Sequence, residues 1–367
     1  MPNTREKGIF KKISINRNYN KFMSGNSILN KAKHTHDTDE WYTDYKTVYE
    51  EVTHYANHFV GKIVLCNCDD PFESAFTKYF LKHFNILKLK KLICTSYKGS
   101  RIIGTLDIFD NNNFKLNNRS AYVLEVENIS KKFDEPLSDE DVLRVLKKKG
   151  NIKQLNGDGD FRSEECIKYL KDSDIIVTNP PFSKFTQLFS LIVKYNKKYL
   201  LIGNQNAITY KDVFPHIKNG KAWIGYRFGD MAFKVPDDTP PRKTRFWIDE
   251  YGQKWRSLGN AMWLTNLDNE RKHKDLILTF FYSPEKHPKY DNYDAINVSK
   301  VSEIPMDYPG VMGVPLTFLK YHNEDQFEIV GEANHGSDNE FDLFKPIVNE
   351  KEIFKRILIK NKKYVTK

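Results

Sequence analysis

The stretch Asp174-Ile175-Ile176-Val177-Thr178-Asn179-Pro180-Pro181-Phe182 decides how this chain folds. Its first part is an apolar, β-branched run of strand length. The two prolines end the strand in a rigid loop because they have a fixed φ and no N–H. Apolar residues follow at helical spacing, namely Phe185, Leu188, Phe189, Ile192 and Val193. Strand, loop and helix in this order predict an α/β fold.

The loop after this strand carries groups suited to chemistry on an amine. The Asn179 side chain and the Pro180 carbonyl can accept both hydrogens of one exocyclic amine, such as N6 of adenine. They would stabilise the charge that builds on the nitrogen as it attacks a methyl sulfonium. Phe182 offers a face for an extruded base. The pattern predicts an amino-methyltransferase that needs no metal; the alternative is a plain proline-rich loop between strand and helix.

Further strands are predicted at residues 62–68, 92–96 and 199–202, alternating with helical segments. This alternation predicts a mostly parallel, doubly wound sheet. In such sheets the ligand lies outside the carboxyl ends of the strands, so the Asp70-Pro71-Phe72 loop after the first of these strands is a candidate for binding a nucleotide-like cofactor. The alternative is a capped helix start, with Asp70 as the cap and Pro71 in the first turn.

Composition limits the class of protein. With 367 residues, a net charge of +10 and a pI near 9.1, the chain can bury a large core and favours a polyanionic partner, of which nucleic acid is the simplest. The four cysteines form no Cys-x-x-Cys pair, which argues against zinc and for a reduced cytoplasmic setting. No apolar run approaches the ~20 residues of a membrane span, and no signal-peptide core is present, so we expect a soluble intracellular protein.

Three regions are predicted along the chain. Residues 1–36 form a basic flexible arm, or else a solvated terminus without function. Residues 37–233 form the catalytic domain, with an insertion at 98–150 that is interpreted as a β-hairpin and a short helix. Residues 234–367 form a target-recognition region with a basic tail.

Basic and aromatic residues alternate at the start of this third region. The candidates for contact with DNA phosphates are Arg242, Lys243, Arg245, Lys254 and Arg256. The aromatics between them are Phe246, Trp247, Tyr251 and Trp255. Cations suit phosphates and planar groups suit wedging beside an extruded base, so the segment is predicted to face a duplex. The alternative is an amphipathic hairpin whose aromatics belong to the core.

Several longer motifs carry a resemblance to a known family. They include Asp-Pro-Phe at 70–72, Gly-Asp-Gly-Asp-Phe-Arg at 157–162, Asn-Pro-Pro-Phe-Ser-Lys-Phe at 179–185 and Gly-Gln-Lys-Trp-Arg-Ser-Leu-Gly-Asn at 252–260. From about residue 30 to residue 360 the chain resembles the EcoRI-type adenine-specific DNA methyltransferases. The resemblance implies a Rossmann-like class I fold that uses S-adenosylmethionine to methylate N6 of one adenine in a short duplex site.

The resemblance also assigns roles to residues. It implies a catalytic loop made of Asn179, Pro180, Pro181 and Phe182. It implies cofactor contacts from Asp70, Pro71, Phe72, Asp158, Asp160, Phe161, Tyr42 and Thr43. Two departures stand out: Ser74 lies in a loop where many methyltransferases carry glycine, and the strand at 92–96 ends without the acid that usually holds the cofactor ribose.

The same resemblance implies a monomer that acts on one strand at a time and a cognate restriction endonuclease encoded elsewhere. It makes GAATTC the first site to try. Two rival functions stay open at this point. One is an N-methyltransferase acting on RNA or on a protein glutamine, and the other is a DNA-binding protein that has lost catalysis.

Overall fold

The computed structural model describes residues 42–68, 70–98, 121–130, 135–148, 150–235, 237, 239–333 and 345–366. The basic N-terminal segment predicted at 1–36 lies outside these ranges. The first strand of the predicted hairpin insertion, residues 101–109, also lies outside them. In the described part, no helix is both long and apolar enough to span a membrane.

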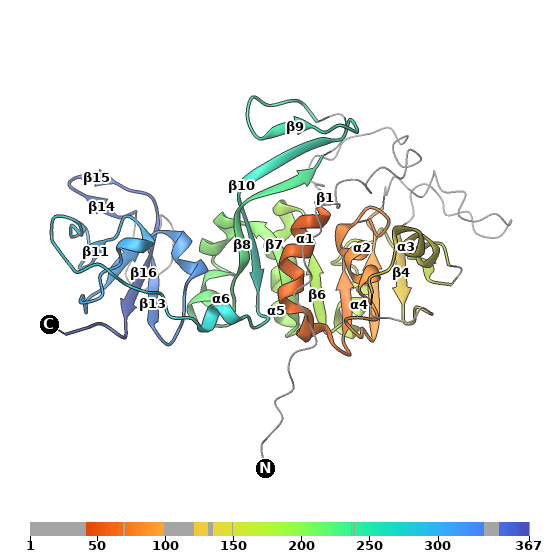
Figure 1. Cartoon of the computed structure of the whole chain (residues 1–367), viewed down its shortest axis with the longest axis horizontal. Coiled ribbons are helices and arrows are strands. Elements are labelled where there is room, and N and C mark those ends of the chain that lie inside the picture. The colour runs from red at the N-terminus through yellow and green to blue at the C-terminus, as the bar shows by residue number, and fades with distance from the viewer. Residues whose placement is uncertain are drawn as a thin grey trace, which may run out of the picture.

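A large sheet of ten strands forms the centre of the molecule (Figure 1). Its four middle strands are parallel, in the order β7 (Lys198–Asn204), β6 (Ile175–Thr178), β2 (Ile63–Cys66) and β3 (Lys91–Thr95). Antiparallel strands extend it on both sides. Beyond β3 lie β4 (Tyr122–Val126) and β5 (Ile152–Gln154). Beyond β7 lie β10 (Lys254–Thr265), β8 (Trp223–Lys234) and β1 (Tyr42–Thr43), and β9 (Phe246–Ile248) pairs with β10.

Helices cover both faces of the sheet, as predicted for a doubly wound fold. One face packs on α1 (Tyr45–Val52), the 3-10 helix η3 (Thr53–Phe59), α2 (Ala75–Lys82) and α3 (Asp139–Leu146). The other face packs on α4 (Glu164–Asp172), α5 (Phe185–Lys194) and α6 (Phe214–Lys218). The parallel strands are therefore buried on both sides, which is why they are apolar runs without polar alternation.

Strand β6 and helix α5 follow the predicted pattern closely. Ile176 points into one core, whereas its neighbours Ile175 and Val177 point into the other, as the two-residue period of a strand requires. In α5 the buried positions are Phe185, Leu188, Phe189 and Ile192. The strand, loop and helix predicted around the two prolines are confirmed.

Part of the predicted insertion belongs to the main sheet. The stretch at 121–127 forms β4, which pairs antiparallel with β3, and β5 then pairs with β4. The predicted short helix is α3, whose amino end is capped by Ser138. The parallel centre of the sheet is thereby shielded from solvent at this edge.

Strand β10 belongs to the main sheet although it lies well past residue 233. In β10, Ala261 pairs with Asn204, the last residue of β7. The residues of β10 before Ala261 therefore run beyond the carboxyl ends of the parallel strands. Together with the end of β8 and with β9 they make a projection, here called the arm, which rises from the sheet in Figure 1. Its described residues are 230–235, 237 and 239–259.

Residues 266–333 and 345–366 form a second unit, here called the C-terminal unit. Its sheet has the order β11 (Ile296–Asn297), β12 (Met312–Val314), β16 (Arg356–Asn361) and β13 (Phe327–Ala333), with the pair β14 (Ile347–Val348) and β15 (Lys351–Glu352) beside it. Its buried residues Phe318 and Ile357 belong to the same apolar cluster as Phe189 of α5. Two cations of the predicted basic tail, Arg356 and Lys360, lie in β16 of this sheet.

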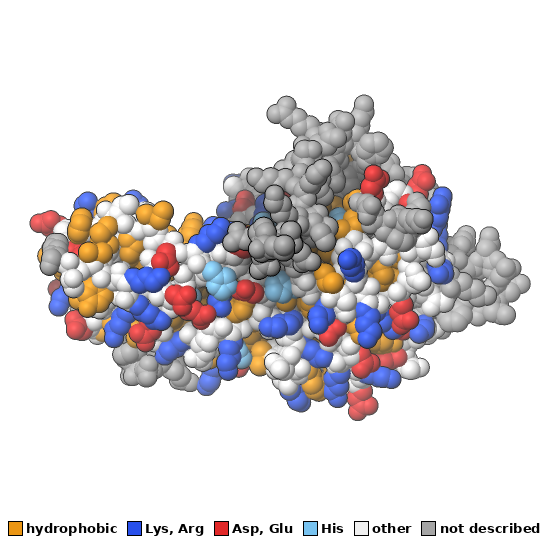
Figure 2. All heavy atoms as spheres, turned by 60° about the horizontal axis from the view of Figure 1, so that its bottom comes forward, with side chains coloured by type: hydrophobic (Ala, Val, Ile, Leu, Met, Phe, Trp, Pro, Cys, Tyr) orange, Lys and Arg blue, Asp and Glu red, His pale blue; other side chains and the backbone are white. Residues whose placement is uncertain are grey.

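Charge is mixed over much of the described surface. On the face seen in Figure 2, Lys and Arg side chains alternate with Asp and Glu. Among the described residues many charges are paired across short distances, for example Lys91 with Glu127 at 2.9 Å.

Candidate active site

The loop after β6 begins at Asn179, which is buried with 7% of its surface exposed. The preceding residue, Thr178, donates a hydrogen bond from its hydroxyl to the carbonyl of Asn67, just after β2. The backbone N–H of Lys184 donates to the carbonyl of Pro181 at 2.9 Å. The start of the loop is therefore held against the residue that follows β2, and its end is closed by a turn of its own.

Phe182 starts the short 3-10 helix η4 (Phe182–Lys184), which leads into α5. Its half-buried ring meets the ring of Phe233 edge-on, with 6.4 Å between the centroids. Phe233 lies on β8 opposite Thr43 of β1. The structure thus brings Phe182 close to the segment that contains Tyr42 and Thr43.

Asp70 organises the loop after β2. One of its carboxylate oxygens accepts from the N–H of Phe72 at 2.9 Å and from the hydroxyl of Tyr122 at 2.8 Å. Helix α2 starts later, at Ala75, and its cap is Ser74, whose hydroxyl accepts from the N–H of Thr77. The alternative interpretation of Asp70 as the helix cap is wrong, because Asp70 instead holds the turn before the helix.

A glycine-like conformation does occur in this loop, but not at Ser74. Cys68, two residues before Asp70, has a φ of +76°. Non-glycine residues rarely adopt this region, and it costs free energy where it occurs. The strained position of the loop thus lies at its start, next to the end of β2.

The Gly157–Phe161 loop lies against the end of β3. Gly159 has a φ of +75°, and a Cβ there would be 2.0 Å from the carbonyl oxygen of Ser96. The N–H of Lys98 donates to the carbonyl of Asp158 at 2.7 Å. Only glycine fits at position 159, because it alone permits both this φ and this close approach.

Asp160 is held by two basic residues. Arg162 donates from Nε to Oδ1 at 2.8 Å and from a terminal nitrogen to Oδ2 at 2.6 Å. Lys184, at the end of η4, lies 3.9 Å from the same carboxylate. The hydrogen bonds from Arg162 lower the pKa of Asp160 to about 2. Asp160 therefore links its loop to the loop that carries Asn179.

Phe161 is 6% exposed and belongs to the apolar core. Its predicted stacking on the cofactor adenine would use only the rim of the ring. Ser96 stands at the end of β3 where many methyltransferases carry an acid. Its hydroxyl accepts from the N–H of Tyr122 at 2.9 Å and donates to the carbonyl of Tyr122 at 3.3 Å. Tyr122 itself was not predicted, because nothing in its local sequence connects it with Asp70.

The predicted phosphate contacts on the arm fall into two groups. Arg242 and Lys243 are exposed, and Arg245 is exposed with its guanidinium 3.5 Å from Asp230. Lys254, however, donates to backbone carbonyls, one of which is that of Thr239 at 3.2 Å. Arg256 is 9% exposed. Of the five predicted phosphate contacts, these last two are therefore less exposed than Arg242, Lys243 and Arg245.

The aromatic residues of the arm are not part of the core. Trp247 and Trp255 stack with centroids 6.2 Å apart, and Trp255 donates from Nε1 to Asp249 at 2.8 Å. Trp247 and Tyr251 are 41% and 51% exposed. The alternative of an amphipathic hairpin with core aromatics is wrong, because none of the four rings joins a buried cluster of the described residues.

These loops meet at one edge of the sheet, as the resemblance to a methyltransferase implies. The family model described as the adenine-specific methyltransferase EcoRI matches residues 28–363. The chain belongs to this family. The predicted family and the predicted enzyme class are therefore confirmed: the protein is an adenine-specific DNA methyltransferase.

Curated relatives agree with the family model. Type II methyltransferase M.EcoRI of Escherichia coli is 44% identical over 342 residues, which cover 92% of this chain and 97% of that protein. Type II methyltransferase M.MgeORF184P of Mycoplasma genitalium and M.MpnI of Mycoplasma pneumoniae are each 34% identical over 308 residues, 82% of this chain. They cover 85% and 84% of those relatives. No solved structure matches this methyltransferase.

Proposed function

We propose that this methyltransferase transfers a methyl group from S-adenosylmethionine to N6 of one adenine in a short duplex DNA site. The Rossmann-like class I assignment is supported by the parallel centre of the sheet and the loops that gather at its carboxyl edge. The observation that carries the proposal is Asn179, buried at the end of β6 directly after Thr178, which is hydrogen-bonded to the carbonyl of Asn67 beyond β2.

The residues at this edge fit a cofactor with an adenosine and an amino-acid end. The acidic side chains at 70, 158 and 160 are acceptors for amines and hydroxyls. The ring of Phe72, two residues after Asp70, lies 6.1 Å from that of Tyr122. Bound there, the cofactor would supply an electrophilic methyl group on sulfur. The residues proposed to hold it are Tyr42, Thr43, Asp70, Pro71, Phe72, Asp158, Asp160 and Phe161.

The catalytic loop would act by positioning and by electrostatic stabilisation. The Asn179 side chain and the Pro180 carbonyl accept the two hydrogens of the amine, which localises its lone pair on nitrogen. Both residues are buried, so the two dipoles act in a medium of low dielectric constant and stabilise the positive charge strongly. Phe182 stacks on the extruded base, and Pro181 keeps the loop rigid.

DNA recognition is proposed for residues 234–367, which the structure divides into the arm and the C-terminal unit. The exposed Arg242, Lys243 and Arg245 lie on the arm, which projects beyond the same strand ends that carry Asn179. Cations so placed suit phosphates beside the target adenine. The net charge of +10 supports attraction to DNA in general.

We further propose that the enzyme acts in the cytoplasm as a monomer and methylates one strand at a time. Its biological role would be the modification half of a restriction-modification system, with a nuclease that shares the site without being bound. The type II names of its relatives support this role.

The test is to incubate the purified protein with S-adenosylmethionine and unmethylated genomic DNA, and then to map N6-methyladenine by single-molecule sequencing. We expect methylation within one short motif, for which GAATTC is the first candidate. The Asn179→Ala variant serves as the inactive control. Cofactor binding without any methylated adenine in DNA would overturn the proposal and direct attention to RNA or protein substrates.

A further inference from the structure

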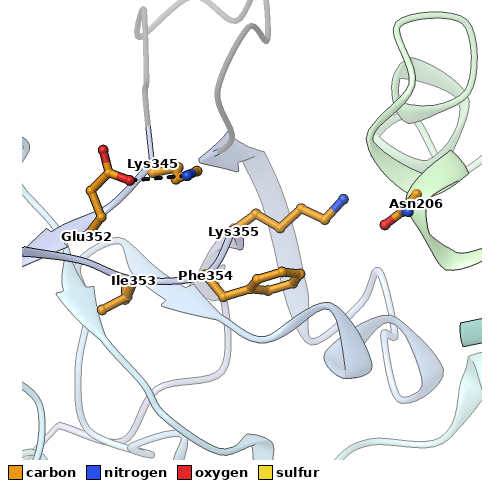
Figure 3. Close-up of a pocket in the computed structure, with 6 residues that line it drawn as sticks. All are labelled: Asn206, Lys345, Glu352, Ile353, Phe354 and Lys355. Atoms are coloured by element: carbon orange, nitrogen blue, oxygen red, sulfur yellow. Dashed lines mark hydrogen bonds and ion pairs between the residues drawn. The ribbon is translucent and has the colours of Figure 1, made fainter. Parts of the chain in front are cut away.

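A pocket lies between the main sheet and the C-terminal unit (Figure 3). One wall is the 3-10 helix η5 (Gln205–Thr209), which follows β7 directly. The other wall is the chain around β15 and the start of β16. The pocket has a volume of about 380 Å³, and its lining residues are Asn206, Lys345, Glu352, Ile353, Phe354 and Lys355.

The position of the pocket relates it to the catalytic loop. Strands β6 and β7 are parallel neighbours, with Thr178 opposite Leu201, so their carboxyl ends lie at the same edge of the sheet. Asn179 follows one strand and η5 follows the other. A duplex whose adenine enters the catalytic loop would therefore approach the edge of the sheet from which η5 starts.

Lys355 is anchored at the boundary between the two walls. Its Nζ lies 3.0 Å from the hydroxyl oxygen of Thr209, and that hydroxyl donates to the carbonyl of Asn206 at 3.1 Å. The half-buried ammonium also interacts with the buried carboxylate of Glu332 on β13. The cation is held in a fixed place instead of moving freely in solvent.

Phe354, next to Lys355, has the opposite character. Its ring is 69% exposed, although a ring of this size is normally buried. In Figure 3 the ring extends in the same direction as Lys355, toward the side where Asn206 lies. An exposed aromatic ring, an anchored cation and an amide therefore face one space.

We propose that this pocket receives one nucleotide of the DNA site other than the target adenine. The phosphate would meet Lys355, the base or sugar would lie on the ring of Phe354, and the amide of Asn206 would contact a base edge. Aromatic rings stack on any base, lysine acts as a point charge for phosphate, and asparagine suits the donor–acceptor pair of an adenine edge. The volume is in the range of small-ligand sites. This inference rests on the proposed DNA substrate.

The test measures equilibrium binding to a duplex that contains the mapped motif, without methyl donor, for the wild type, Phe354→Ala and Lys355→Ala. The control is Lys90→Ala, which removes an exposed lysine just before β3, at the amino edge of the sheet. Loss of one stacked base or one phosphate contact is expected to raise Kd about 10-fold. Lys90→Ala should bind like the wild type.

Two further variants separate DNA recognition from folding and from methyl transfer. Phe354→Tyr should bind the duplex like the wild type because it keeps the ring. The Asn206→Ala enzyme should methylate DNA sites that are altered at one flanking base pair more readily than the wild type does. If Phe354→Ala and Lys355→Ala bind like Lys90→Ala while the wild type methylates its motif, the inference is wrong and the proposed function stands. If the wild type neither binds nor methylates duplex DNA, the proposed function fails, and this inference with it.

Discussion

The loop after β6 and the arm lie on the same side of the sheet but are built in opposite ways. The start of the loop is buried and held in place, with Thr178 bonded across to Asn67 and with Asn179 7% exposed. The arm projects from the sheet and exposes Trp247, Tyr251 and several cations. The comparison teaches that the groups proposed for chemistry occupy rigid backbone, whereas those proposed for DNA contact occupy surface.

The sharpest test of the rigid region is Asn179→Ala. We expect methyl transfer to fall by at least about 100-fold, because one pre-placed acceptor in a buried site is lost. Binding of S-adenosylmethionine, followed by calorimetry, should stay near the wild-type value. Wild-type turnover in this variant would show that the catalytic loop lies elsewhere.

The matching test of the arm is the triple variant Arg242→Ala, Lys243→Ala, Arg245→Ala. Three lost phosphate contacts should weaken duplex binding by about 100-fold at moderate salt and reduce the salt slope by about 3. The rate at saturating DNA should change little, because none of these residues touches the catalytic loop in the structure.

A change in net charge alone must be excluded as the cause of weaker DNA binding by this triple variant. A control variant that replaces Lys62, Lys88 and Lys90 with alanine removes the same charge from the opposite edge of the sheet. Equal weakening of binding in both triple variants would mean that the arm acts only through net charge and makes no phosphate contacts of its own.

The support beneath the catalytic loop can be broken at Gly203 on β7. A Cβ there would lie 2.7 Å from the ring of Phe185, which is buried at the start of α5 and cannot move away. Gly203→Ala should lower the free energy of unfolding by about 1–3 kcal/mol, as overpacking does. Urea denaturation measures this. Gly157→Ala is the control, because a Cβ there meets nothing within 4 Å.

A smaller effect on the free energy of unfolding is expected from the ionisation of Glu51, whose side chain joins α1 to β8. It is fully buried and accepts hydrogen bonds from the N–H groups of Tyr226 and Arg227 at 2.8 Å each. Burial raises its pKa to about 7. A raised carboxyl pKa means that the folded state holds the proton more tightly than the unfolded state. Its contribution to stability is therefore present below the unfolded pKa and lost as pH rises through about 7.

This pH dependence can be isolated with Glu51→Gln. Between pH 6 and pH 8 the wild type should lose roughly 1 kcal/mol of stability that the variant does not lose. Parallel urea titrations at the two pH values measure the difference. An identical change in both proteins would show that Glu51 keeps the same charge at both pH values.

Local features of the fold were predictable from sequence. The apolar run at 175–178, the two prolines and the helical spacing after them gave β6, its loop and α5, because each depends on neighbouring residues. The prediction of a mostly parallel sheet holds for its centre. The antiparallel position of β10 between β7 and β8 was not predicted, since it depends on pairing with strands distant in the chain.

In the candidate site, too, some residues were predictable from the sequence and others became apparent only in the structure. The motif identified Asn179 and Asp70, but not the hydroxyl of Tyr122 that contacts Asp70 from 52 positions away. Five cations on the arm looked alike in sequence. Only the structure separated the exposed Arg242, Lys243 and Arg245 from the two that are engaged or buried.

The sequence by itself determined the family, the order of the strands and loops along the chain, and the residue types of the catalytic loop. Tertiary structure alone decided which side chains meet. Lys355, which lines the pocket beside η5, reaches Thr209 across 146 positions. The physical reason is that strand and loop signals are local, whereas burial and hydrogen-bond partners are fixed only when distant segments pack together.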